Sequence, residues 1–99
     1  MYAISNLNKL AQIGELVPET MEKFKAWDKA ALADGAIPKK YKELMAVAMA
    51  LSTQCPYCIE VHRQQAVDAG ATETELAETV HVAAALRAGG AITHGTHLF

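Results

Sequence analysis

The sequence lacks the features that mark several large classes of protein. Its longest apolar run, Leu44–Leu51, has eight residues, well short of the roughly 18–20 that cross a bilayer. The N-terminus has no basic segment followed by an apolar core, the pattern of a signal peptide. A net charge of −2 gives no excess of basic groups, which nucleic acids and anionic membranes select. We therefore expect a cytoplasmic protein with neither kind of partner.

Aromatic residues, prolines and cysteines are also few. Of the 99 residues 6% are aromatic, 3 are proline and 2 are cysteine, yet 52% are hydrophobic. That content excludes a disordered chain and exceeds the soluble average of roughly 45–50%. A chain of this length forms at most one domain, and alone it buries only about 60–65% of its unfolded surface. The length thus predicts a single domain over residues 1–99, and the apolar excess predicts that this domain forms a homo-oligomer.

Prolines and glycines punctuate the sequence, and no stretch alternates as a half-buried strand would. The pattern predicts an all-α fold, a compact bundle of about five helices. The expected helices are Ser5–Ile13, ended by Gly14; one from Pro18, closed by Gly35; one from Pro38 to about Ser52; one from Cys55-Pro56 to just before Gly70; and one after Thr72, ended by Gly89-Gly90. The segment Ala91–Phe99 has no clear assignment.

Three details sharpen this prediction. Thr72 and Glu75 form the pattern of a capping box, which marks a helix start. A stripe at helical spacing is expected to be the inner face of the second helix: Met21, Phe24, Trp27 and Ala31. With Met45 and Met49, the aromatic residues of this stripe are expected to pack in the core or to form the walls of an apolar substrate pocket.

The two cysteines lie together in the stretch Cys55-Pro56-Tyr57-Cys58. In a reducing compartment such a pair is more often redox-active or metal-binding than structural. A bridge across two residues closes too small a loop to stabilise the fold much. Ile59 stands where haem attachment needs a histidine. A redox pair, a metal site and a chance pairing remain as alternatives.

Two features favour the redox alternative. Pro56 places the pair at the first turn of a helix, where free N–H groups and the helix dipole favour a thiolate. His62, four residues after Cys58, lies on the same helix face and can accept a thiol proton. We expect Cys58, the nearer sulfur, to be the activated thiol and Cys55 its disulfide partner. By the dipole alone, Cys55 would be the more acidic.

Glu43 directly precedes the apolar run. If the helices on either side of residues 52–54 form a hairpin, Glu43 lies roughly 13 Å from the turn and His62 roughly 10 Å. The carboxylate and the imidazole would then meet and form a proton relay with Cys58. The alternative is that Glu43 faces water in the first turn of its helix.

A family resemblance rests on these residues. Glu43, eleven further residues and then Cys55-Pro56-Tyr57-Cys58-Ile59-Glu60-Val61-His62 resemble the E…C-x-x-C-x-x-x-H pattern of the alkylhydroperoxidase D-like, or carboxymuconolactone decarboxylase, superfamily. Gly70-Ala71-Thr72 and the acidic, alanine-rich stretch after it resemble the segment that comes after the motif in that family. The resemblance covers roughly Ile37–Leu86. The decarboxylase branch lacks the cysteine pair, so this chain resembles the thiol branch.

The resemblance implies an all-helical fold, with a helical hairpin carrying the C-x-x-C motif, in subunits that form trimers or hexamers. By the match, the site consists of a relay glutamate, Glu43; a resolving cysteine, Cys55; an attacking cysteine, Cys58; and a relay histidine, His62. The implied activity is reduction of a peroxide or a disulfide without a cofactor. The electrons would come from an external dithiol such as a lipoyl protein.

A metal-binding or purely structural oligomeric module is the alternative function. His94 and His97 are three residues apart and would complete a Cys2His2 zinc set with the cysteine pair, although the spacing is far from that of a zinc finger. His81, on the apolar fifth helix, is expected to be a core or interface histidine.

Overall fold

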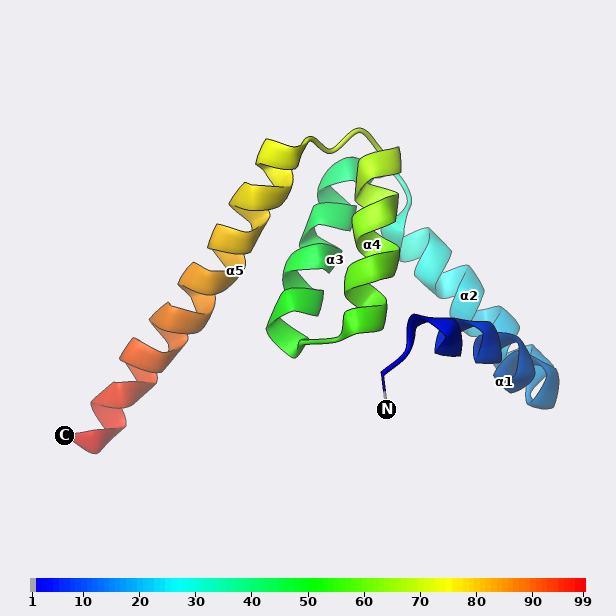
Figure 1. Ribbon diagram of the computed structural model, residues 1–99, viewed down its shortest axis with the longest axis horizontal. Coiled ribbons are helices and arrows are strands. Elements are labelled where there is room, and N and C mark those ends of the chain that lie inside the picture. Colours follow the sequence, from blue (N-terminus) through cyan, green and yellow to red (C-terminus); the bar gives the residue numbers. More distant parts are fainter. Residues whose placement is uncertain (1) are drawn as a thin grey trace.

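The computed structural model describes residues 2–99, which form helices joined by short connections (Figure 1). Within this part of the chain there is no strand, and no helix is both long and apolar enough to span a membrane. The elements are η1 (Ile4–Lys9), α1 (Leu10–Leu16), α2 (Pro18–Leu32), α3 (Lys39–Thr53), α4 (Pro56–Asp68), α5 (Glu73–His94) and η2 (Gly95–Leu98). The predicted all-α fold with five helices is confirmed.

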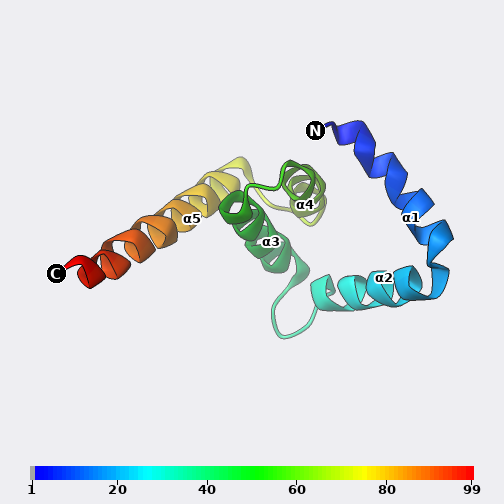
Figure 2. The same ribbon diagram turned by 90° about the horizontal axis from the view of Figure 1, so that it is seen from below.

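Helix α3 is the centre of the molecule. It packs against α4, with which it forms a hairpin, and against the first half of α5 (Figures 1 and 2). The buried residues lie where these three helices meet: Glu43, Val47 and Ala50 of α3, Ala66 of α4 and Ala83 of α5. Small side chains at these positions allow the helix backbones to approach closely. The polar member of the set, Glu43, is fully buried.

The turn between α3 and α4 sets the position of the cysteine pair. Gln54 ends α3 in the left-handed region at φ 57°, and the N–H of Cys55 then donates to the Ala50 carbonyl at 3.1 Å. The predicted starts at Pro38 and at Cys55-Pro56 are correct to within a residue. Gly70 has φ 99°, a conformation that favours glycine, so α4 ends before it as expected.

The predicted stop of the first helix at Gly14 is wrong. Helix α1 continues through Gly14 to Leu16. A Cβ atom at residue 14 would lie 3.2 Å from Cγ of Met21, so this glycine makes room for α2. The helix ends instead at Leu16, because Val17 precedes Pro18 and a residue that precedes proline is driven out of the helical region.

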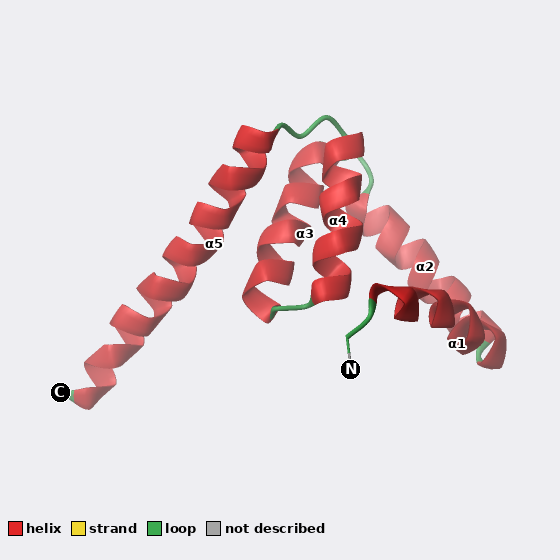
Figure 3. Ribbon diagram, in the orientation of Figure 1, coloured by secondary structure: helices red, strands yellow, loops and turns green. Residues whose placement is uncertain are grey.

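The predicted end of the fifth helix at Gly89-Gly90 is also wrong. Helix α5 passes through both glycines and ends at His94 (Figure 3), and η2 follows. A glycine ends a helix by taking a positive φ, and among residues 2–99 Gly70 is the one glycine that does so. In an alanine-rich helix a glycine costs only about 1 kcal/mol.

The predicted inner stripe of α2 does not form a core in the single chain. Phe24 is 54% exposed and Trp27 is 72% exposed, and Met45 and Met49 of α3 are exposed as well. The loop before Pro38 connects α2 to the hairpin of α3 and α4, and most of α2 lies beyond these two helices (Figure 2). The spacing of the stripe correctly marks one helix face, but this face is only partly covered in the single chain: Met21 lies against α1, whereas Phe24 and Trp27 stay exposed.

The described chain is extended for its length. Its dimensions are 51 × 33 × 27 Å and its radius of gyration is 16.3 Å, against about 13 Å for a typical domain of this size. The accessible surface is 7583 Å², where a folded monomer of this mass exposes about 5,500 Å². Every residue of α5 from Ala84 to His94 is exposed. Much of the surplus surface thus lies on this half of α5.

Candidate active site

Glu43 is the largest fully buried side chain in residues 2–99, with 0% of its surface exposed. Its Oε1 accepts a hydrogen bond from Nζ of Lys39 at 2.9 Å, and its Oε2 lies 2.8 Å from Nδ1 of His62. The amide nitrogen of Gln65, turned toward the carboxylate, donates to Oε1 at 2.8 Å. These three donors satisfy a charge that would otherwise be costly to bury. Glu43 does not face water, so the solvent-exposed alternative is wrong.

The contact with Glu43 fixes the tautomer of His62. A carboxylate only accepts hydrogen bonds, so Nδ1 of the ring carries the proton that it donates. In the neutral ring Nε2 then has a lone pair and can accept a proton. The ring is 19% exposed, which leaves it accessible from one side. The hairpin thus joins Glu43 and His62 at the depth that their sequence spacing predicts.

The two cysteines form a pair at the first turn of α4. Their Sγ atoms lie 2.9 Å apart and share a hydrogen bond, and both residues are free thiols. Cys55 is the N-cap of α4, and its Sγ accepts the backbone N–H of Cys58 at 3.4 Å. Cys58 is the more exposed of the two. Each sulfur is therefore placed to form a disulfide with the other.

The pKa values of the two thiols are shifted in opposite directions. The hydrogen bond from the Cys58 thiol, followed by the backbone N–H of Cys58, lowers the pKa of Cys55. The same thiol–thiol hydrogen bond is the first cause that raises the pKa of Cys58. These two directions favour Cys55 as the more acidic thiol, as does its position at the helix terminus.

The thiols and His62 open into one pocket with a volume of about 480 Å³. Within residues 2–99 no hydrogen bond joins the His62 ring to either sulfur, so the last link of the expected relay is not a direct contact at rest. The residues that line the pocket are Asn6, Leu7, Leu10, Phe24, Asp28, Cys55, Tyr57, Cys58, Val61 and His62. Of the predicted apolar walls, only Phe24 is among them.

The N-terminal segment covers one side of this pocket and is hydrogen-bonded to Tyr57, a residue of the C-x-x-C motif. The amide of Asn6 donates to the hydroxyl of Tyr57 at 2.9 Å, and the N–H of Ala3 donates to it at 3.4 Å. The ring of Tyr2 lies 5.3 Å from that of Tyr57. Tyr57, between the two cysteines, thus holds η1 beside the thiols.

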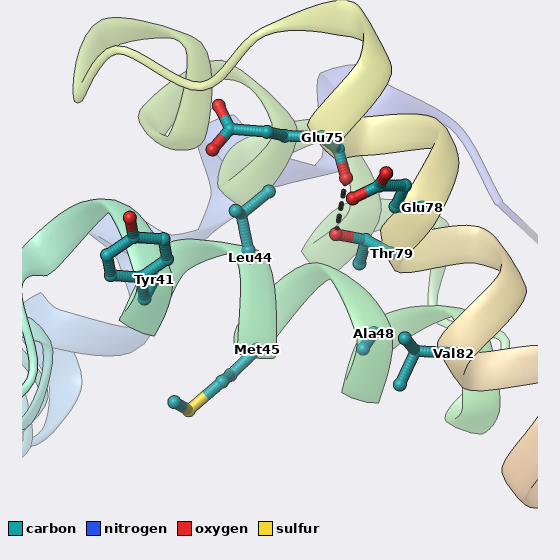
Figure 4. A pocket seen from close by; sticks show the side chains of 8 residues that line it. All are labelled: Tyr41, Leu44, Met45, Ala48, Glu75, Glu78, Thr79 and Val82. Carbon is teal, nitrogen blue, oxygen red and sulfur yellow. Dashed lines mark hydrogen bonds between the residues drawn. The ribbon is translucent and has the colours of Figure 1, made fainter.

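A second pocket, of about 360 Å³, lies between α3 and α5 (Figure 4). Its walls are the side chains of Tyr41, Leu44, Met45 and Ala48 on α3 and of Glu75, Glu78, Thr79 and Val82 on α5. It contains no cysteine or histidine. Met45, which was expected in the core, is therefore a wall of this groove and not of the pocket beside the thiols.

The other histidines are not assembled with the cysteine pair. His94 and His97 lie 5.7 Å apart, ring to ring, at the far end of α5 (Figure 1). In the described part of the chain no group of three or more histidine, cysteine, aspartate or glutamate side chains is placed to hold a metal ion. The Cys2His2 set is thus not formed within one chain. His81 is exposed, which excludes the core position that was one of its two expected places.

Sequence reasoning missed three residues of the site. Lys39 precedes Glu43 by four residues and Gln65 follows His62 by three, so each shares a helix face with one member of the Glu43–His62 pair, and both donate to the Glu43 carboxylate. That spacing is a signal that could have identified both. Asp28 lies in the pocket because of the way α2 folds back, and no local pattern predicts this.

The site is thus a vicinal dithiol at a helix N-terminus, next to a buried glutamate–histidine pair, in an all-helical chain. The family model of the carboxymuconolactone decarboxylase family matches residues 18–99. The chain belongs to that family, and the resemblance found in the sequence is confirmed.

Two uncharacterised proteins are similar in sequence to most of this chain. The sequence is 49% identical over 71 residues to uncharacterised protein 4 of the cox locus of Paracoccus denitrificans, a match that covers 72% of this chain and 64% of that protein. It is 39% identical over 70 residues to an uncharacterised protein of Cupriavidus necator, covering 71% and 62%. The chain therefore spans less than two thirds of the length of these two relatives.

Two solved structures are similar over most of the chain. A carboxymuconolactone decarboxylase family protein from Legionella pneumophila, in its apo form, has a TM-score of 0.80 and 38% identity, covering 93% of this chain and 82% of its own. A protein from Methanobacterium thermoautotrophicum has a TM-score of 0.79 and 38% identity, covering 86% and 96%. Most of the arrangement of helices is therefore shared with both structures, one of which is described as a member of the family.

Proposed function

We propose that the protein is a thiol-dependent oxidoreductase that reduces a peroxide or a disulfide with the Cys55–Cys58 pair. The observation that carries the proposal is the hydrogen bond of 2.8 Å between buried Glu43 and His62. His62 in turn lines the pocket that also holds both sulfurs. A carboxylate that orients an imidazole beside a thiol is an arrangement that activates a nucleophile. A purely structural pair of thiols would not require a buried charge next to it.

In the proposed reaction Nε2 of His62 takes one proton from the dithiol, directly or through a water. The remaining proton is shared between the sulfurs, and the resting charge lies mainly on Cys55. Transfer of that proton across the 2.9 Å between the sulfurs moves the charge to Cys58. We assign the attack to Cys58 because it is the more exposed sulfur and because its position matches the attacking cysteine of the family motif.

With a peroxide, the Cys58 thiolate attacks one oxygen and the O–O bond breaks. The alkoxide leaves with the proton held by His62, and Cys58 becomes a sulfenic acid. Cys55 then attacks that sulfur, water leaves, and a disulfide forms. The sum is one peroxide and two thiols converted to one alcohol, one water and one disulfide, which an external dithiol reduces. A lipoyl protein is the donor that the resemblance suggests.

Single cysteine variants test this division of roles. Cys58→Ser should abolish turnover of peroxide and of a small disulfide with dihydrolipoamide as donor. Cys55→Ser should still consume about one equivalent of peroxide per chain and then stop, because no resolving thiol is left. The measurement is peroxide consumed per chain, with sulfenic acid trapped by dimedone and located by mass spectrometry.

The other outcomes are equally informative. A first round that survives in Cys58→Ser but not in Cys55→Ser would assign the attack to Cys55, in line with its lower pKa. Turnover that is unchanged in both variants would contradict the thiol mechanism. About one zinc per chain, with both thiols resistant to peroxide, would favour the metal-binding module.

We also propose that the protein is a homo-oligomer, as its apolar composition predicts. A single chain exposes roughly 2,000 Å² more than a folded monomer of its mass, and obligate interfaces bury 2,000–5,000 Å² in total. Leu86 and Ile92, at 70% and 77% exposure, lie on the half of α5 that no other helix of the chain covers. A second copy of the chain is the partner that suits so large an apolar surface. The resemblance suggests assemblies of three or six copies.

A further inference from the structure

The pocket beside the thiols has an unbalanced charge. Among its lining residues Asp28 is the one acidic side chain, and no lysine or arginine is present. Within residues 2–99 the Asp28 carboxylate forms no ion pair and is exposed. Its negative charge therefore acts on whatever enters the pocket, reduced only by solvent and salt.

The rest of the lining is mainly apolar. Leu7, Leu10, Phe24 and Val61 face the same space as the two sulfurs. Leu7 and Leu10 lie outside residues 18–99, which the family model matches. The N-terminal segment thus gives this pocket walls that the family match does not include.

We propose that this pocket selects apolar substrates that are uncharged or cationic and rejects anionic ones, with Asp28 as the residue that determines the preference. The inference rests on the proposed function, because the substrate must reach the thiols. An anion near Cys58 meets both a thiolate and the Asp28 carboxylate, and the one lining side chain that can oppose these two charges is His62, which carries a single positive charge when it holds the thiol proton. A cation is attracted by the same two charges.

A disulfide substrate is reduced in two exchange steps. The Cys58 thiolate attacks one sulfur, and the S–S bond breaks. The leaving thiolate takes the proton that His62 holds. Cys55 then attacks the mixed disulfide, which releases the second half of the substrate as a thiol and leaves the Cys55–Cys58 disulfide. The substrate is reduced to two thiols and the protein loses two.

Three small disulfides of similar size test the preference: cystamine, which is cationic; 3,3′-dithiodipropionate, which is anionic; and hydroxyethyl disulfide, which is neutral. The reduced full-length protein reacts with each in single-turnover experiments, and loss of thiols gives a rate constant. The rate constant of each charged disulfide is divided by that of the neutral hydroxyethyl disulfide. We expect the cystamine to dithiodipropionate ratio to exceed one and to fall about three- to tenfold in Asp28→Asn, as one charge near the site predicts.

Glu22→Gln is the matched control, because it removes the same charge from the same helix at a residue that does not line the pocket. The cystamine to dithiodipropionate ratio of Glu22→Gln should equal that of the wild type. In Asp28→Lys this ratio should be lower still than in Asp28→Asn, because the added positive charge favours the anionic disulfide. Equal ratios in wild type and Asp28→Asn, or an equal fall in Glu22→Gln, would overturn the inference. If neither the neutral disulfide nor hydrogen peroxide oxidises the wild-type pair, the proposed function falls, and this inference with it; if only hydrogen peroxide does so, the preference among disulfides alone is overturned.

Discussion

Lys39 and Gln65 make it possible for Glu43 to lie fully buried next to the pocket. Lys39 is the one lysine or arginine that forms an ion pair with this carboxylate in the described chain, at 2.9 Å, and its side chain is 41% exposed. Removing one donor leaves the buried carboxylate with an unsatisfied hydrogen-bond acceptor, which is costly. At the scale of single residues, Lys39 is therefore a positioning residue that acts on His62 through Glu43.

We expect Lys39→Met to lower the free energy of unfolding by roughly 1–2 kcal/mol and to slow oxidation of the thiols by peroxide. Lys39→Arg, which keeps the charge, should recover most of both losses. Urea unfolding and thiol oxidation rates measure the two effects. Lys23→Met is a control, since Lys23 forms no ion pair in residues 2–99. Equal losses in the methionine and arginine variants would show that the charge is not what matters.

The thiol pair makes a second prediction at this scale. The first cause of the lowered pKa of Cys55 is the hydrogen bond from the Cys58 side chain. Cys58→Ala removes that donor, whereas the hydroxyl of Cys58→Ser keeps one. The pKa of Cys55, followed by thiolate absorbance at 240 nm, should therefore be higher in the alanine variant than in the serine variant. The same pKa in both would mean that the helix terminus alone sets the acidity.

Individual residues of the site differ in how well the sequence predicts them. The meeting of Glu43 and His62 follows from two helix lengths and one turn, which are local quantities. The order of thiol acidity depends on whether a sulfur caps the helix or lies inside its first turn, a difference of a few ångströms. Spacing places both cysteines on one helix face but does not resolve that difference.

At the scale of helices, the ion pair between Lys40 of α3 and Glu75 of α5 joins the two elements at 2.9 Å. The hydrogen bond from Lys40, then that from the Thr72 N–H, lowers the pKa of Glu75 from its ordinary value of 4.5. A carboxyl group whose pKa is lower in the folded than in the unfolded state stabilises the fold at pH values above its unfolded-state pKa. The contribution disappears as the pH falls through the folded-state pKa.

Glu75→Gln isolates this contribution, because an amide oxygen can still accept the Thr72 N–H of the capping box. We expect the variant to melt at a lower temperature than the wild type at pH 7, with the gap closing below about pH 4. Glu73→Gln, also in the first turn of α5 but without a lysine partner, should show a smaller gap at pH 7. A gap in Glu75→Gln that persists at pH 3 would contradict an ionic origin.

Helix starts are predicted better than helix ends in this chain. Prolines and the Thr72 capping box act locally, through missing N–H groups and side-chain hydrogen bonds, so their positions are read directly from the sequence. A glycine is ambiguous: Gly70 ends α4 with a positive φ, Gly14 accommodates Met21, and Gly89-Gly90 simply continue α5. Which role applies depends on tertiary neighbours.

At the scale of the whole molecule, apolar spacing identifies helix faces but not the partner that covers each face. The stripe with Phe24 and Trp27 is a helix face, as predicted, yet in the single chain it is exposed. Periodicity is a property of one helix, whereas burial depends on every neighbour, including other copies of the chain. The composition also indicates burial by other copies, since a single chain of this length cannot bury all of its apolar residues.

A final prediction concerns the exposed half of α5, where a second copy is proposed to bind. Leu86→Glu places a charge on this apolar surface and should shift the protein toward smaller species in sedimentation velocity, because burying an unpaired carboxylate at an interface is costly. Ala77→Glu is the matched control: it adds the same charge to the same helix, nine residues earlier and so on the opposite face. It should leave the assembly unchanged. A wild-type protein that sediments as a monomer, or an assembly that tolerates Leu86→Glu, would mean that α5 is not the interface.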